Sequence, residues 1–138
     1  MRSLDTLVRL HRFKVDEIRR DLAALGKLID DLAAKDAAIV DQIAHEKRVA
    51  ATDPELARSY GAFAAHALAR RRRLAESRAE IEGRVAERQE HLRDAFAELK
   101  RHEKLRDQRQ ARETAERERK AAQLLDEIAL DMHRRKAG

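Results

Sequence analysis

Apolar residues spaced alternately by three and four run through residues 15–43 of this chain. Counted from Val15, heptad a positions fall at 15, 22, 29, 36 and 43, and d positions at 18, 25, 32 and 39. All of them are large aliphatic residues except Asp36. A period of about 3.5 residues held over several heptads is typical of a coiled coil. Because the other faces are charged or Ala, the narrow stripe requires a second helix laid along it.

The residues before this stripe extend its apolar face with a less regular phase. The interval between Leu7 and Val15 departs from the heptad spacing. We expect the following residues to carry an apolar face towards Val15: Leu4, Leu7, Leu10, His11 and Phe13.

The strongest break in the pattern is the tetrapeptide at residues 52–55, which holds the only proline. Pro54 disfavours helical geometry at the residue before it, so a first helix must end there. The same residues can start a second helix. Either Asp53 caps it with Pro54 in the first helical position, or Thr52 and Glu55 form a capping box.

The apolar residues of the second half fit the first stripe in an antiparallel register. In an antiparallel hairpin, the numbers of facing residues have a constant sum. Ile29 with Ile81 and Ile18 with Leu92 both sum to 110, which puts the turn at residue 55, beside Pro54. We therefore predict an all-α fold, a long antiparallel two-helix coiled-coil hairpin forming a single domain over residues 1–138.

The same register sets the expected bounds of the helices. We expect helix 1 over about 3–50, a turn over about 51–60 with Gly61 interrupting the helix that follows, and helix 2 over about 55–134. Beyond about residue 106, helix 2 has no partner left in the chain and forms an extended C-terminal part. Its charged sequence gives way to a short apolar stripe at Leu124, Leu125, Ile128 and Met132.

Composition supports long helices and excludes several classes of protein. Charged residues make up 41% of the chain and aromatic residues 3%, which leaves few side chains for a rounded core. Without Cys, disulfides and thiolate metal sites are excluded. Charged residues interrupt every apolar run well short of the roughly 18 residues that span a bilayer, and no signal peptide is recognisable. We expect a cytoplasmic protein.

No arrangement of residues predicts catalysis. Carboxylates are strung along the helices beside basic residues, and the six histidines are scattered. His45 and Glu46 lack the second histidine of a zinc-protease motif, and no glycine-rich phosphate loop is present. We expect a protein that is not an enzyme, with no cofactor and no metal.

The densest basic run is four arginines at residues 70–73. Successive helical residues point in different directions, so the run makes no single face. One interpretation is structural, with Arg71 facing the seam and Arg70 or Arg73 paired with Asp36. An anionic protein partner or nucleic acid are the alternatives, and the lack of aromatic residues for base stacking weakens the last. We expect no nucleic-acid partner.

Two regions are candidates for partner binding. Near the turn, apolar residues either close the hairpin tip or form a docking surface; they are Ile39, Val40, Ile43, Tyr60 and Phe63. At the other end, the stripe of Leu124, Leu125, Ile128 and Met132 is a docking surface, or else an end that folds back or self-associates.

The opening block at residues 3–20, Ser-Leu-Asp-Thr-Leu-Val-Arg-Leu-His-Arg-Phe-Lys-Val-Asp-Glu-Ile-Arg-Arg, resembles the start of FliJ-type flagellar export proteins in their alphaproteobacterial form. Residues 96–101 and 125–130 resemble the same family. The resemblance implies a stalk-like, non-enzymatic component of flagellar type III export. Its implied partners are the export ATPase hexamer, the cytoplasmic domain of the export-gate membrane protein and export chaperones.

The resemblance also implies where these partners bind. The helix ends enter the ATPase ring, which here involves residues 124–132, and the hairpin near the turn contacts the gate through residues 39–43 and 60–67. A monomer located in the cytoplasm, at the face of the inner membrane, is expected. The alternatives are a general coiled-coil adaptor, the stalk counterpart of an injectisome, or a basic helical nucleic-acid binder.

Overall fold

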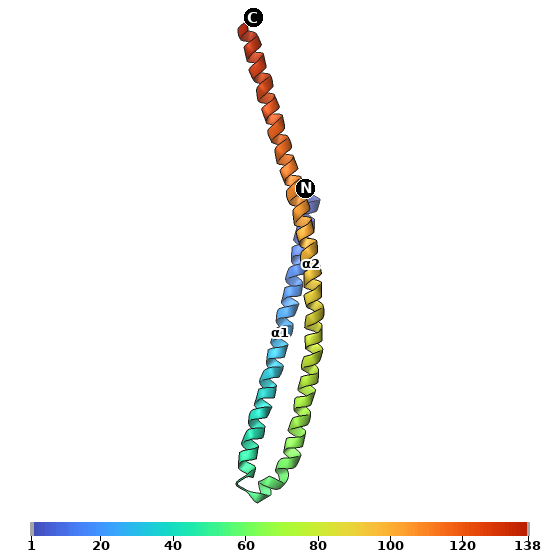
Figure 1. Ribbon diagram of the computed structural model, residues 1–138, viewed down its shortest axis with the longest axis vertical. Coiled ribbons are helices and arrows are strands. Elements are labelled where there is room, and N and C mark those ends of the chain that lie inside the picture. The colour runs from blue at the N-terminus through green and yellow to red at the C-terminus, as the bar shows by residue number, and fades with distance from the viewer. Residues whose placement is uncertain (1, 138) are drawn as a thin grey trace. The chain divides into compact units, whose positions relative to one another are not determined.

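The computed structural model describes residues 2–137, which form two helices and no strand. Helix α1 spans Arg2–Ala50 and helix α2 spans Pro54–Ala137 (Figure 1). The predicted all-α fold with two long helices joined as a hairpin is confirmed.

The turn between the helices occupies residues 51–53, shorter than the expected 51–60. The Thr52 hydroxyl donates to the Val49 carbonyl at 2.7 Å, just beyond the end of α1. The capping box is excluded because the Glu55 amide, which Thr52 would have to accept from, donates to Asp53 instead. The Asp53 carboxylate accepts a hydrogen bond from the Glu55 amide at 3.0 Å and caps α2, with Pro54 in its first position. Gly61 keeps a helical backbone, so α2 continues through it without interruption.

The contacts divide the chain into two compact units. The first unit combines the segment that ends at Val15 with the segment that begins at Ala95, and the second spans Asp16–Asp94. Within each unit, a segment of α1 lies antiparallel to a segment of α2 (Figure 1). A single coiled-coil domain over residues 1–138 stays a prediction.

In the second unit, the predicted heptad positions of α1 form the seam. Every one of them from Ile18 to Ile43 is buried or half-buried. On α2, Ala67 is buried and most of the predicted facing residues are half-buried, whereas Arg78 is exposed. Two ion pairs cross the seam close to the predicted register, Asp36 with Arg71 and Asp21 with Arg88, each at 2.8 Å.

In the first unit, the seam uses a different face of α1 from the one expected. Val8 is only 1% exposed, and Val15 and Leu99 are buried as well. The expected face included three residues that the structure leaves exposed, Leu7, Leu10 and Phe13. The physical reason is that only one stripe of a helix can meet its partner. That stripe continues the heptad backwards without a change of phase, through His11, Val8 and Leu4.

The numbers of Gly26 and Gly83 sum to 109, so the antiparallel register predicts that they lie nearly opposite each other, either as a close approach of two backbones or as a soft point. A Cβ atom built at either glycine meets nothing within 4 Å, which excludes the close approach. Both lie in helix interiors with negative φ.

We therefore expect Gly26→Ala and Gly83→Ala each to raise the free energy of unfolding by about 0.5–1 kcal/mol, because alanine loses less backbone entropy in a helix. Thermal and urea denaturation followed by circular dichroism measures the change. The exposed Ala79→Gly is the matched control and should lower stability by a similar amount. Destabilisation by either alanine would mean that the glycine site is tighter than the geometry shows.

Replacing Ile18 by Asp places a charge in a seam that has few fully buried residues. We expect a loss of about 3 kcal/mol or more and a marked fall in helicity. Arg19→Asp, at the exposed neighbouring position, should retain nearly wild-type helicity. Equal effects of the two substitutions would contradict the assignment of the seam.

Candidate partner-binding surfaces

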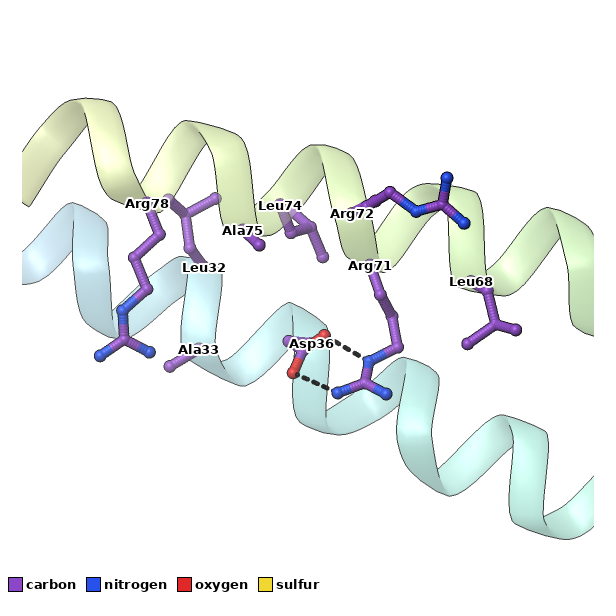
Figure 2. Close-up of a pocket in the computed structure, with 9 residues that line it drawn as sticks. All are labelled: Leu32, Ala33, Asp36, Leu68, Arg71, Arg72, Leu74, Ala75 and Arg78. Carbon is purple, nitrogen blue, oxygen red and sulfur yellow. Dashed lines mark hydrogen bonds and ion pairs between the residues drawn. The ribbon is translucent and has the colours of Figure 1, made fainter.

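Among the heptad positions of α1 in the second unit, Asp36 is the one that carries a carboxylate. Arg71 Nε donates to Asp36 Oδ1 at 2.8 Å and Arg71 Nη2 donates to Oδ2 at 3.3 Å, a two-point ion pair (Figure 2). The hydrogen bond from Arg71 lowers the pKa of Asp36. The expectation that Arg70 or Arg73 would pair with Asp36 was wrong. Arg71 is the half-buried arginine of the run whose side chain points towards α1, whereas Arg70 and Arg73 are exposed.

A pocket of about 400 Å³ surrounds this ion pair, and we call it the Asp36 groove. It occurs where the heptad places a short carboxylate in place of a large aliphatic side chain. Both helices line it (Figure 2), and its residues are Leu32, Ala33, Asp36, Leu68, Arg71, Arg72, Leu74, Ala75 and Arg78. The sequence predicted a polar residue at position 36 but not the groove. The feature that could have predicted the groove is this single break in the aliphatic heptad.

The apolar residues near the turn form a cluster that is partly covered. The rings of Tyr60 and Phe63 lie 6.5 Å apart between centroids at a tilt of 39°, and both residues are half-buried. Ile43 is half-buried and Val40 is exposed. Ile39 is only 4% exposed, so this candidate belongs to the core and cannot contact a partner while the hairpin is closed.

The C-terminal stripe is uncovered. From residue 114 to residue 137 every residue of α2 is exposed, and Leu125 is 67% exposed. The other stripe residues, Leu124, Ile128 and Met132, are exposed as well. Because α2 continues without a break to Ala137, the alternative of an end that folds back is wrong.

Two ion pairs form within this segment, each along the helix itself. Arg119 binds Glu116 at 2.7 Å and Arg135 binds Asp131 at 3.3 Å. Pairs at these spacings support a solvated helix by a few tenths of a kcal/mol each. These pairs support the helix while its apolar side chains stay exposed.

A pair of stacked histidines lies in the seam of the first unit. The rings of His11 and His102 are 4.2 Å apart between centroids, with 28° between their planes. His102 Nδ1 lies 2.8 Å from the Glu98 carbonyl oxygen, which can only accept, so Nδ1 carries the proton. Beside the pair, Arg12 contacts Glu103 at 3.5 Å.

The pKa of His11 is lowered, first by burial and then by the positive fields of His102 and Lys14, against the opposing field of Glu98. The register sum of 110 predicts Leu99 opposite His11. The signal for the true neighbour was that His102 lies three residues after Leu99, on the same face of α2.

Among residues 2–137, no three metal-binding side chains come together, and no helix is long and apolar enough to cross a membrane. No polar or charged residue of the described chain is fully buried.

These features define a helical-hairpin protein whose exposed helix surfaces are available for binding other proteins, as in coiled-coil adaptor and stalk proteins. The chain belongs to the family described as "Flagellar FliJ protein", whose model matches residues 1–138. The resemblance seen in the opening block is thereby confirmed. Comparisons with curated proteins and with solved structures found no match. Membership makes the chain a component of the flagellar protein export apparatus, in a family of structural adaptors.

The histidine pair predicts a pH dependence of stability. His11 binds its proton less readily in the folded chain than at its ordinary pKa of 6.5. The unfolded chain therefore takes up more protons below that pH, and the contribution of neutral His11 is complete above pH 6.5 and is lost as the pH falls below it.

We expect the denaturation midpoint to fall as the pH is lowered from neutral through that window, and His11→Phe to weaken this dependence. His66→Gln, at an exposed position, is the control and should behave as wild type. An unchanged pH profile in His11→Phe would assign the dependence to other groups.

Proposed function

We propose that this chain is the stalk of the flagellar export apparatus, with the C-terminal part of α2 inserted in the ring of the export ATPase. The observation that carries the proposal is the exposed stripe of Leu124, Leu125, Ile128 and Met132 in a chain of this family. Burial of each such side chain contributes about 1.5–3 kcal/mol. Four of them provide enough apolar surface for a specific protein contact.

The form of the segment supports insertion in a pore. A single helix with its side chains is about 10–12 Å wide. Two of its ion pairs, Glu116 with Arg119 and Asp131 with Arg135, join neighbours one turn apart, which lowers the cost of placing these charges inside a ring. Because the stripe lies on one side of the helix, it favours some subunits of a symmetric ring over others. Such differential binding is what shifts an equilibrium between subunit states.

The hairpin near the turn is the second contact region in this proposal. It binds the cytoplasmic domain of the export-gate membrane protein, and export chaperones associate with the same apparatus. The available apolar side chains are Val40, which is exposed, and the half-buried Ile43, Tyr60 and Phe63. Contact with the gate would hold the protein at the cytoplasmic face of the inner membrane.

The test is the double substitution Leu125→Asp with Ile128→Asp in the full chain. Both side chains are exposed, so we expect wild-type helicity and melting temperature. Loss of two apolar contacts should weaken binding to the export ATPase of the same organism about 100-fold, by roughly 3 kcal/mol. Isothermal titration calorimetry measures the affinity, and a coupled assay measures the stimulation of ATP hydrolysis.

The matched control is Gln110→Asp with Ala115→Asp, which adds the same charge at exposed positions without large apolar side chains. This control should bind as wild type. Wild-type affinity in the Leu125/Ile128 variant would show that the stripe does not contact the ATPase. Failure of the wild-type chain to bind the ATPase would contradict the stalk proposal itself.

A further inference from the structure

The Asp36 groove has an apolar floor that a helix can approach. Leu68 is exposed and Leu32 and Leu74 are half-buried, so a large part of the floor faces water. Ala33 and Ala75, also part of the lining, are small enough to let another backbone come close. The arrangement suits an apolar helical stripe laid across it.

The groove carries an excess of positive charge. Residues 68–78 of α2 contain five arginines and one glutamate. Arg71 is neutralised by Asp36, and Arg78 contacts Glu82 of its own helix at 2.9 Å. Arg72 is exposed on the groove wall (Figure 2). An occupant with acidic side chains beside its apolar stripe would be attracted.

One segment of this chain has that composition. Residues 123–132 contain three acidic residues and no basic one, together with the uncovered stripe. Glu127 and Asp131 lie one turn apart beside Leu124 and Ile128, so the acidic and apolar side chains share one side of the helix. Asp131 also contacts Arg135 of its own helix at 3.3 Å, and Asp126 and Glu127 leave the segment negatively charged. The segment therefore complements the groove in both charge and hydrophobicity.

The groove and the segment both lie on α2, which runs unbroken over Pro54–Ala137. We propose that the Asp36 groove binds the 123–132 segment of a second copy of this chain. The contact is heterologous, since a groove on one copy meets a stripe on the next, so association adds further copies as concentration rises.

This inference goes beyond the proposed function and revises the expectation of a monomer, which considered the seam alone. A ten-residue segment covers less than the roughly 800 Å² per partner of a stable interface, so the association is weak and reversible. Because the same stripe is proposed to enter the ATPase ring, self-association and ring insertion exclude each other. The contact would keep the stripe covered until the export ATPase displaces it.

The test is sedimentation equilibrium of the full chain over a wide concentration range at low salt. We expect the average mass to rise with concentration and to fall back towards that of the monomer near 0.5 M salt, where charges are screened within about 5 Å. A monomer mass at every concentration in low salt would overturn the proposal, and would also be the result if the groove served a different acidic protein. The ATPase proposal is untouched by that outcome, since it is measured by ATPase binding.

Charge reversal identifies the two surfaces. Arg72→Glu with Arg78→Glu reverses the groove, and Glu127→Lys with Asp131→Lys reverses the segment. Each variant alone should associate at least tenfold more weakly than wild type, with unchanged helicity. An equimolar mixture should associate again, because each wild-type surface then finds a wild-type complement and the reversed surfaces complement each other.

The matched control for the groove variant is Arg58→Glu with Arg93→Glu, which changes net charge equally at exposed positions outside the groove. It should associate more strongly than the groove variant at the same salt. Equal weakening by the control, or no recovery in the mixture, would show that net charge rather than the groove governs association and would overturn the proposal.

Discussion

Lateral pairing of a narrow apolar stripe is the interaction on which this molecule depends. Neither helix has a wide apolar face, and few residues are fully buried, so each stretch of α1 is held only by the stretch of α2 that packs beside it. Helix propensity alone does not supply stability on this scale, because most helical stability in proteins comes from packing of an apolar face. The buried residues of this protein are therefore those of the seam.

Two polar residues of α1 interrupt the aliphatic seam, and each adds a specific interaction: an ion pair at Asp36 and a histidine stack at His11. Asp36 interrupts the heptad, fixes Arg71 in a two-point ion pair and opens a groove that a continuous leucine seam would have filled. A buried polar residue at such a position is a recognised device for specifying register. His11 departs in another way, since its burial, and then the positive field of the stacked His102, lower its pKa and make stability depend on pH below 6.5.

The candidate partner-binding surfaces lie outside the seam. For a component of the flagellar export apparatus, the uncovered stripe around Leu125 and Ile128 is the most direct candidate for a partner contact, because nothing in the described chain covers it. The tip is a weaker candidate, since Ile39 is buried and the Tyr60–Phe63 ring pair is partly covered. The proposed ATPase contact and the proposed self-association use the same stripe, so the two would compete for one surface.

The sequence by itself determined the class of fold, the heptad from Ile18 to Ile43, the end of α1 before Asp53 and the family, because period, proline and motif are local properties of the chain. The C-terminal stripe was also predictable, since the antiparallel register leaves it without a partner. Tertiary structure decided which stripe of the first turns of α1 is buried, Val8 rather than Leu7 and Leu10. It also decided that Arg71 binds Asp36 and that His11 stacks on His102. These choices depend on the rotation of each helix about its axis and on the reach of long side chains across the seam, which are settled only when the two helices pack together.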